Sequence, residues 1–567
     1  MQGENISEYS VDIEGGKGVS VEKINRADSP NYLFIDVDIA ENAAPGTYYI
    51  VFTGNGVSFK YPYVIQAREE GSAERKSFTT ADMIYLIMPD RFANGDTGND
   101  STDDTSDKCA REELFGRHGG DIQGIIDNLD YISELGATAI WCTPLLEDNQ
   151  PEHSYHGYAC TDYYRIDPRF GTNDLFKEYV SKAHEKGLKI IMDIVPNHAG
   201  SAHWWMEDTP FKDWYHIFDT YTGSNICFSS NNDYNASKAD LYYHESGWFD
   251  KSMVDMNLDN PFVLKYFQQW AIWWIEYADL DGLRVDTYPY IEKVPGSQWV
   301  AAIRNEYPNM NIVGECWTRP APAVAYWQSG VKNFDGFDSN LPTVMDFPTE
   351  EAIRQALEND GKGWGNGLTR VYDALTMDYL YADVNKLLTF LGNHDMARIT
   401  DVVKDKDLRR VKLAYVLLAT MRGIPQVLYG DEYAMTSAGE DPSNHSYLRA
   451  PLPQGDEVTA EMQDMFDFQS KLFQWRKNEP VLHTGKTMHF LTRDNTYAFF
   501  RYDKESAVFV FANASDQVRV APTENYAEIL SQYNPVGINP LTGETVDLRR
   551  ADVAAPALST IVVKLHK

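Results

Sequence analysis

The sequence predicts an α/β protein: a (β/α)8 TIM barrel that carries a long inserted segment, flanked by an N-terminal β-sandwich and a C-terminal antiparallel β-domain. Three observations lead to this prediction. Short apolar strands alternate with amphipathic helices through the middle of the chain, eight such strands can be counted, and both ends of the chain instead alternate with a period of two. The 567 residues leave room for several domains at roughly 100–200 residues each.

The N-terminal segment, predicted to span residues 1–70, has the pattern of a small β-sandwich. Apolar and acidic residues alternate from Leu33 to Ala40, and Thr47 to Phe52 form a further strand after the turn signal Ala44-Pro45-Gly46. The opening residues lack the charged and apolar regions of a signal peptide. Because the β pattern begins almost at once, we expect this domain to be truncated at its natural start, which would also hide a secretion signal.

The barrel is predicted over residues 78–484, with helical patterns such as Asp121–Leu135 and Phe262–Tyr277 between its strands. An excursion at about 197–257, rich in aromatic residues, Asn and Gly, separates the third strand from its helix. Such an insertion lies on the C-terminal face of a barrel, where active sites are found. The eight expected strands are Met83–Met88, Thr138–Trp141, Leu188–Ile194, Gly282–Asp286, Asn311–Glu315, Phe334–Asp338, Leu388–Gly392 and Gln426–Tyr429.

The last segment, residues 485–567, returns to alternating strands and predicts a structural antiparallel β-domain. Its expected strands are Tyr497–Tyr502, Ala507–Ala512 and Thr560–Leu565.

Composition excludes several classes of partner. The net charge of −34 disfavours nucleic acid and anionic membrane surfaces, because both are bound through Lys and Arg. No run of about 18 apolar residues is present, so we expect no membrane insertion. The five cysteines are odd in number and contain no CxxC pair, so they predict neither a disulfide framework nor a zinc ribbon.

Polar and charged residues gather where the predicted barrel strands end. Arg284 and Asp286 end the fourth strand, Glu315 ends the fifth, and His394 and Asp395 follow the seventh. Residues two apart on a strand face the same side, so Arg284 and Asp286 point into one mouth. A single Asp at a strand end is more often an ion pair or a cap, but three carboxylates from three strands of one barrel point to catalysis.

This set of side chains suits the cleavage of glycosidic bonds. That chemistry needs one carboxylate to attack the anomeric carbon and one carboxylic acid to protonate the leaving oxygen. Arg284 beside Asp286 would keep a nucleophile ionised. Imidazoles such as His198 and His394 hydrogen-bond sugar hydroxyls, and Trp204, Trp205, Trp317 and Tyr288 are candidate aromatic residues of the cleft.

A second group of oxygen donors predicts a Ca²⁺ site. Asn94, Asp96, Asn99 and Asp100 lie within seven residues, and the Gly119 carbonyl and Asp121 would complete the shell. Ca²⁺ takes 6–8 oxygen ligands of these kinds. The offsets are not those of an EF-hand, and the alternative interpretation is a solvated acidic turn.

The motifs together resemble glycoside hydrolase family 13, the α-amylase family. They occur in family order and span the barrel from about 80 to 435. The matching segments are HGYACTDYYRIDPRFGT (156–172), MDIVPNH (192–198), MVDMN (253–257), GLRVDTYPY (282–290), VGECW (313–317), FLGNHD (390–395) and GIPQVLYGDE (423–432).

The resemblance implies a role for each matching residue. Asp286 would be the nucleophile, Glu315 the acid/base and Asp395 the transition-state stabiliser. Tyr158 would stack on the sugar beside the scissile bond, and His198, Arg284 and His394 would contact sugar hydroxyls. The excursion 197–257 looks like the family's domain B. The reaction would retain configuration through a covalent glycosyl-enzyme, with the two carboxyl groups about 5–5.5 Å apart.

Within the family, the chain is similar to the neopullulanase/cyclomaltodextrinase branch and especially to starch-utilisation-system neopullulanases of gut bacteria. This implies α-1,4 cleavage of malto-oligosaccharides, pullulan, cyclodextrins or starch, the Ca²⁺ site above, a periplasmic or secreted location and a possible homodimer. One departure is Pro289-Tyr290, where many α-amylases have Lys-His. The alternatives are an α-glucan transglycosylase on the same scaffold and a non-catalytic glycan-binding protein, and the balance of α-1,4 and α-1,6 cleavage stays open.

Overall fold

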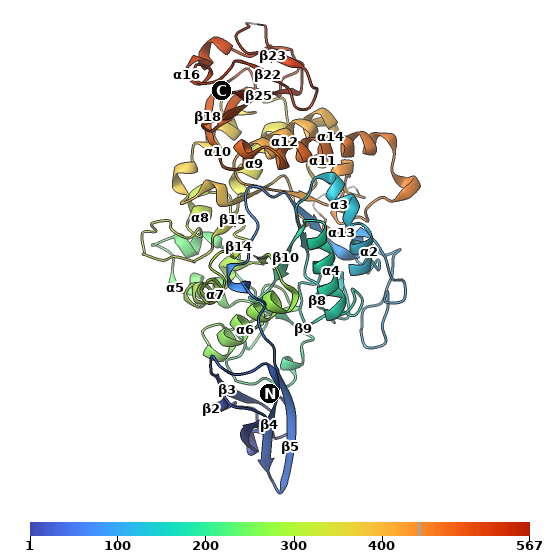
Figure 1. The fold of residues 1–567 in the computed structure, drawn as a ribbon, viewed down its shortest axis with the longest axis vertical. Helices are drawn as coiled ribbons and strands as arrows, with labels where there is room; N and C mark the ends of the chain where they lie inside the picture. Colours follow the sequence, from blue (N-terminus) through green and yellow to red (C-terminus); the bar gives the residue numbers. More distant parts are fainter. Residues whose placement is uncertain (440–443, 551) are drawn as a thin grey trace.

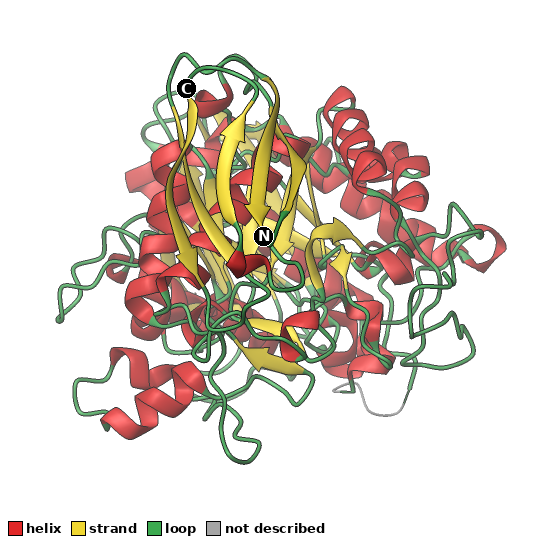
Figure 2. Cartoon of the chain, turned by 90° about the horizontal axis from the view of Figure 1, so that it is seen from below, coloured by secondary structure: helices red, strands yellow, loops and turns green. Residues whose placement is uncertain are grey.

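The computed structural model describes residues 1–439, 444–550 and 552–567. Figure 1 shows an elongated molecule in which the barrel occupies the middle, the N-terminal strands one end and the C-terminal strands the other. Figure 2, turned by 90° and seen from below, shows strands in the centre with helices on both sides.

The centre is a closed barrel of eight parallel strands, which confirms the predicted fold class. Neighbours around the barrel follow the order β10-β13-β14-β15-β16-β17-β6-β7. Apart from Lys189, where β10 begins, every residue of these strands is buried, because helices cover them outside and side chains fill the barrel inside. The strands are β6 (Ile84–Ile87), β7 (Ala139–Cys142), β10 (Lys189–Ile194), β13 (Gly282–Val285), β14 (Asn311–Gly314), β15 (Thr343–Met345), β16 (Leu387–Phe390) and β17 (Ile424–Leu428).

The prediction of the sixth strand at Phe334–Asp338 is wrong. That segment is a loop, and the sixth strand is the three-residue β15 farther along the chain. Asp335 accepts from the backbone of Phe337, and the Asn333 amide donates to two carbonyls, those of Tyr326 and Phe337. These local side-chain bonds give the backbone an alternative to ladder pairing, so an alternating pattern of Phe and Asp does not become a strand.

Helices cover the barrel, and several of them, α4 and α6 among them, begin at side-chain caps. Thr172 accepts from the Leu175 amide at the start of α4, and Asn260 caps α6 with Pro261 as its first residue. The expected helix Asp121–Leu135 forms two pieces that meet at Asn128. The main helices are α2 (Ile122–Asp127), α3 (Leu129–Leu135), α4 (Asn173–Glu185), α6 (Pro261–Ala278), α7 (Lys293–Glu306), α9 (Phe347–Leu357), α10 (Thr369–Leu375), α12 (Leu408–Thr420) and α14 (Ala460–Lys477).

The excursion after β10 forms a separate lobe against the barrel mouth. Its strands β11 (His198–Gly200) and β12 (Met253–Asp255) pair antiparallel, and α5 (Lys238–Ser246) lies between them. The lobe also holds the N-terminal strands. Asp208 accepts hydrogen bonds from Ser29, at 2.7 Å, and from Asn31, at 2.8 Å.

Antiparallel sheets form both ends of the molecule, as predicted. The N-terminal part has a three-stranded sheet, order β1-β4-β5, and the two-stranded sheet β2-β3. The C-terminal part has a six-stranded sheet, order β18-β19-β20-β25-β22-β23. Their strands are β1 (Ser10–Glu14), β2 (Val19–Arg26), β3 (Leu33–Ile39), β4 (Gly46–Gly54), β5 (Val57–Ile65), β18 (Lys486–Arg493), β19 (Thr496–Tyr502), β20 (Ser506–Asn513), β22 (Val536–Ile538), β23 (Thr545–Asp547) and β25 (Ser559–His566).

Within the described ranges, none of the helices combines the length and the apolar character needed to cross a bilayer. All five cysteines are free thiols.

Candidate active site

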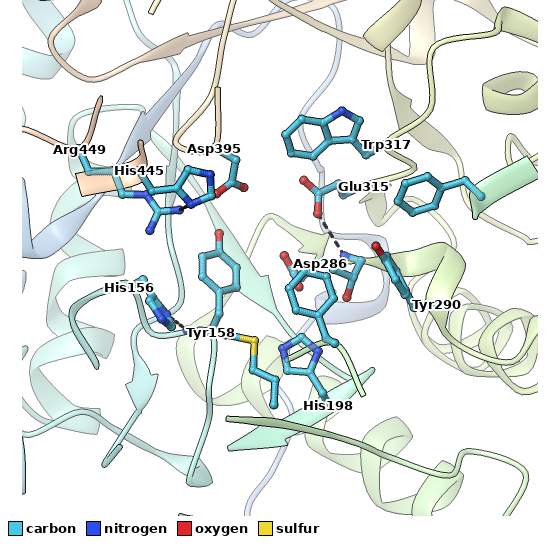
Figure 3. Close-up of a pocket in the computed structure, with 14 residues that line it drawn as sticks. His156, Tyr158, His198, Asp286, Tyr290, Glu315, Trp317, Asp395, His445 and Arg449 are labelled. Carbon is cyan, nitrogen blue, oxygen red and sulfur yellow. Dashed lines mark hydrogen bonds and ion pairs between the residues drawn. The ribbon is translucent and has the colours of Figure 1, made fainter. Parts of the chain in front are cut away.

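Three barrel strands deliver the three predicted carboxylates to one end of the barrel. Asp286 directly follows β13 and Glu315 directly follows β14, and their amides continue the ladder by donating to Ile194 and Val285. Asp395 lies in the segment that leaves β16. Because the carboxyl ends of parallel barrel strands meet at one face, these residues converge although they are far apart in the sequence. Figure 3 shows Asp286 and Glu315 side by side, with Asp395 nearby.

Arg284 joins two of these carboxylates. Its Nη1 donates to Asp286 Oδ1 at 2.7 Å, and its Nη2 lies 2.8 Å from Glu315 Oε1. The same guanidinium donates to Asp193 Oδ1 at 3.0 Å. Arg284 is fully buried, so its charge is poorly screened and acts strongly on all three acids. One cation therefore places Asp286 and Glu315 next to each other.

The surroundings of Glu315 favour its protonated form. Burial raises its pKa to about 8, with the negative charge of Asp286 adding to the rise and the Arg284 cation opposing it. The Thr287 amide donates to Glu315 Oε2 at 3.2 Å. Thr287 reaches it from a left-handed conformation, φ 46°, which turns the chain sharply after Asp286. The pocket therefore places an acid with a raised pKa beside an aspartate that Arg284 binds.

Asp395 is held ionised. Burial alone would raise its pKa, but the neighbouring His394 and the Arg449 guanidinium outweigh burial and hold the pKa below its usual range. Arg449 Nη2 donates to Asp395 Oδ1 at 2.5 Å, and its Nε donates to the His394 carbonyl at 2.8 Å. His394 Nε2 lies 3.2 Å from Asp395 Oδ2 and 2.6 Å from the Tyr158 hydroxyl.

These groups open into a pocket of about 310 Å³. Aromatic side chains form much of its wall: His198 stacks on Phe249 with ring centroids 5.3 Å apart, and Phe249 contacts Tyr290 edge to face at 5.4 Å. Sugar rings present apolar C–H faces and polar rims, so a wall of aromatic rings with carboxylates at its base suits a carbohydrate. The lining residues are His156, Tyr158, His198, Phe228, Phe249, Met253, Asp286, Thr287, Tyr290, Glu315, Trp317, Asp395, His445 and Arg449.

Five of the six predicted substrate contacts lie at the pocket, in two groups. Tyr158, His198 and Trp317 line the pocket. Arg284 and His394 are fully buried directly behind it, where they contact the lining carboxylates.

Tyr288 is the exception and corrects the prediction. Its hydroxyl donates to the Ser339 carbonyl at 3.2 Å, and its ring packs edge to face on Trp327, so it is a core residue. Trp204 and Trp205 do not line the pocket either; they pack with His203.

Several lining residues were not predicted. His445 and Arg449 belong to no recognised motif, although Arg449 is the cation that binds Asp395. Phe228 and Phe249 lie in the excursion, whose richness in aromatic residues was the available signal, and Met253 begins the matching segment MVDMN. Tyr290 ends the segment GLRVDTYPY, which was discussed above only because Pro289-Tyr290 replaces the Lys-His of many α-amylases. His156 lines the pocket and begins the matching segment 156–172.

The predicted calcium ligands also come together. Asp121 Oδ1 and Oδ2 accept from the Gly95 and Asp96 amides at 3.0 and 2.9 Å, and Oδ2 also accepts from the Asn99 amide group at 3.1 Å. Asn94 donates to Asp100 Oδ1 at 2.6 Å. A Cβ on Gly119 would lie 2.5 Å from that same oxygen, which places the Gly119 backbone against Asp100.

Two features bear on whether a cation fits this loop. The amide oxygens of Asn94 and Asn99 are buried and have no hydrogen-bond partner. Buried amide oxygens without a hydrogen-bond partner are available as ligands, and Ca²⁺ binds oxygens of this kind. In the described part of the chain, no cluster of three or more His, Cys, Asp or Glu side chains has metal-binding geometry, so amide and carbonyl oxygens would have to contribute.

Family comparisons agree with this geometry. The profile described as the α-amylase catalytic domain matches residues 86–520. The chain belongs to the α-amylase family. The profiles of the cyclomaltodextrinase N-terminal and C-terminal domains match residues 1–69 and 487–564. Together they put it in the neopullulanase/cyclomaltodextrinase branch of glycoside hydrolase family 13.

Similar proteins include amylases and a cyclomaltodextrinase. The β/α-amylase of Paenibacillus polymyxa is 29% identical over 442 residues, which cover 76% of this chain but only 33% of that protein. The cyclomaltodextrinase of Thermoanaerobacter pseudethanolicus is 29% identical over 469 residues, 81% of this chain and 74% of that protein. The solved α-amylase of Geobacillus thermoleovorans in complex with acarbose superposes with a TM-score of 0.69 at 26% identity, covering 87% of this chain and 100% of that one.

Proposed function

We propose that the protein is a retaining α-glucan hydrolase that cleaves α-1,4-glucosidic bonds in malto-oligosaccharides, pullulan, cyclodextrins or starch. The observation that carries this proposal is the pairing of Asp286 and Glu315 on the single buried guanidinium of Arg284. A carboxylate and a carboxylic acid at one pocket are the two groups that glycoside hydrolysis requires.

The reaction follows from the two protonation states. Glu315 donates its proton to the glycosidic oxygen, the bond between that oxygen and the anomeric carbon breaks, and Asp286 Oδ forms a bond to the anomeric carbon on the opposite face. Glu315, now a carboxylate, takes a proton from water, and the water oxygen displaces Asp286. Two inversions give net retention, and the mechanism predicts carboxyl groups about 5–5.5 Å apart.

The other groups bind and stabilise. The ionised Asp395, fixed by Arg449, accepts hydrogen bonds from sugar hydroxyls and favours the positive charge that develops at the oxocarbenium-like transition state. Tyr158 is positioned to stack on the sugar beside the scissile bond, and Trp317 provides an aromatic surface on the side of Glu315.

A structural Ca²⁺ in the loop around Asn94 is part of the proposal. Asn94, Asp96, Asn99, Asp100, Asp121 and the Gly119 carbonyl would hold it. The unpartnered amide oxygens of Asn94 and Asn99 support it. The ion would fix the loop that follows β6; it takes no part in bond cleavage.

Product analysis tests the proposed activity. Chromatography of products from pullulan, starch and β-cyclodextrin should show cleavage of each, with panose from pullulan for the neopullulanase type. An Asp286→Asn variant in parallel should give no products. Cleavage by that variant at the wild-type rate, or no cleavage of any α-glucan by the wild type, would refute the proposal.

A transglycosylase is the second candidate, because it would form the same intermediate and differ only in what accepts the sugar. Incubation at high maltotriose concentration distinguishes the two: longer oligosaccharides indicate transfer, and glucose and maltose alone indicate hydrolysis. A purely glycan-binding protein is disfavoured, since all three carboxylates are present and converge.

A homodimer is proposed from the N-terminal sheet. Val57, Phe59 and Tyr61 lie exposed on one face of β5, because residues two apart on a strand point to the same side; Tyr49 and Val64 are exposed on the opposite face. An exposed apolar surface of this kind is typical of protein interfaces. Light scattering after size-exclusion chromatography would measure the mass, and a Phe59→Asp variant should be monomeric. A periplasmic or secreted location rests on the family resemblance.

A further inference from the structure

One tryptophan lies entirely outside the core. Trp364 is fully exposed, whereas among the described residues the next most exposed tryptophan, Trp204, is 37% exposed. It stands in the loop Asp360–Gly367, between α9 and α10, where the glycines at 361, 363, 365 and 367 all have positive φ. A fully exposed indole leaves its ring faces free to stack on a ligand.

The loop that carries Trp364 is fixed at both ends. Asp360 pairs with Lys404 at 2.7 Å and with Arg410 at 3.3 Å. Asn495, from the turn between β18 and β19, accepts from the Leu368 amide at 2.9 Å and donates to the Asp360 carbonyl at 3.3 Å. A Cβ on Gly367 would lie 2.2 Å from Asn495 Oδ1, so glycine is required there. These contacts hold the base of the loop and present Trp364 outward.

A groove runs beside this tryptophan. Its volume is about 360 Å³, and the neighbours Gly363 and Asn366 help to line it together with the β18–β19 turn. It meets a second groove of about 470 Å³, with which it shares Arg493, Asp494 and Arg519. The two grooves form one stretch of surface where the barrel and the C-terminal sheet meet.

The chemistry of this surface suits a neutral polyhydroxyl chain. The charged residues of the first groove balance, three acids against three bases: Asp360, Asp494, Asp516, Lys362, Arg493 and Arg519. A nucleic acid would need an excess of basic residues, which the first groove lacks. The second groove adds aromatic side chains, Tyr372, Phe490 and Tyr526, beside these polar groups. Alternating donors and acceptors beside an exposed indole can hydrogen-bond sugar hydroxyls while the ring stacks on a sugar face.

We propose that Trp364 and the adjoining grooves form a second α-glucan-binding site, separate from the catalytic pocket. The choice of an α-glucan as ligand rests on the proposed function. Both sites adjoin the segment between β16 and α12, because that segment carries Asp395 at its start and Lys404 further on. A polymer held at this surface therefore stays near the pocket at a raised effective concentration.

Binding without turnover tests the proposal. All variants carry Asp286→Asn, so that the ligand is not consumed, and migrate through native gels containing amylose. Trp364→Ala should weaken binding about tenfold, equivalent to about 1.4 kcal/mol, and Arg493→Ala should weaken it less. Tyr379→Ala is the matched control: it removes an aromatic side chain that is 78% exposed but lies outside both grooves, and should migrate like its parent.

Activity supplies the second measurement, in chains with Asp286 intact. Trp364→Ala should lower hydrolysis of starch granules several-fold and leave kcat/KM for maltotriose unchanged, because a trisaccharide fills only the pocket. Unaltered gel retention of Trp364→Ala, or an equal loss on maltotriose, would overturn the proposal. So would a change from dimer to monomer in light scattering, which would make the surface a protein interface. A wild type that cleaves no glucan refutes the hydrolase instead, and the gel result is read independently.

Discussion

The catalytic pocket and the Trp364 surface both present aromatic rings and charged groups, but the charges are buried in the pocket and exposed to water at the Trp364 surface. In the pocket, one buried guanidinium holds Asp286 and Glu315, and burial raises the pKa of Glu315 to about 8. At the Trp364 surface the charges balance in pairs open to water, as between Asp360 and Lys404. The difference shows the effect of burial. Buried charges are poorly screened by water, so they shift the pKa of neighbouring carboxyl groups and make them reactive, whereas carboxylates exposed to water form only weak ion pairs.

The largest effect should come from removing the nucleophile. Asp286→Asn should lower kcat on maltotriose by about 10⁴-fold or more, because no covalent intermediate can form. Amylose-gel retention should stay near the wild-type value. Steady-state kinetics and gel migration of the same preparation provide the comparison, and parallel loss of both would show that the two regions are not independent.

Removing the acid should have the next largest effect and should alter the pH profile. In the wild type, kcat/KM should fall as pH rises through about 8, because Glu315 must carry its proton to act. Glu315→Gln should lower kcat on maltotriose by about 10³-fold and remove this alkaline limb. α-Glucosyl fluoride, whose leaving group needs no proton, should be much less affected. If the wild-type kcat/KM already fell as pH rose through about 5, the assignment of Glu315 as the acid would be contradicted.

Arg449 should affect the pocket through Asp395. Arg449→Ala removes the cation that lowers the pKa of Asp395, so that pKa should rise and the acid limb of kcat/KM should move to higher pH. We expect a loss of about 10- to 100-fold at pH 6 and a smaller loss at pH 8. Arg449→Lys should restore part of the loss. A uniform loss at all pH values would instead indicate a structural role.

Calcium removal should have the smallest effect on catalysis. A cation that binds only the folded chain stabilises it by about 2.7 kcal/mol at 100 times its Kd. EGTA should therefore lower the Tm by about 2–5 °C, and a double variant, Asn94→Ala with Asn99→Ala, should no longer respond to EGTA. The double variant's own activity at 25 °C should stay within about twofold of the wild type. A Tm that EGTA leaves unchanged would argue against the site.

Sequence reasoning found the parts of the site that follow directly from strand ends. Asp286, Glu315 and Asp395 could be predicted because parallel strands all finish at one face. Arg449 could not, since it is 54 residues beyond Asp395 and approaches it only in the folded barrel. Tyr288 was misplaced because a helical turn after Thr287 directs it into the core and leaves Tyr290 to line the pocket.

The same limit explains the error in the fold. Seven barrel strands were predicted near their observed positions because their apolar runs are long enough to be seen. The sixth, β15, has only three residues, and the more visible alternation at Phe334–Asp338 is a loop held by its own Asn and Asp side chains. Local polar bonds of this kind are not apparent from periodicity.

The triple contact of Arg284 has a consequence for the timing of proton transfer. In the free enzyme the negative charge of Asp286 helps Glu315 keep its proton. Once Asp286 is esterified that charge is gone, and the guanidinium is left to act on Glu315 and Asp193. The affinity of Glu315 for a proton then falls just when the second half of the cycle needs it as a base. Formation of the covalent bond to Asp286 thus converts Glu315 from an acid into a base, without any movement of the backbone.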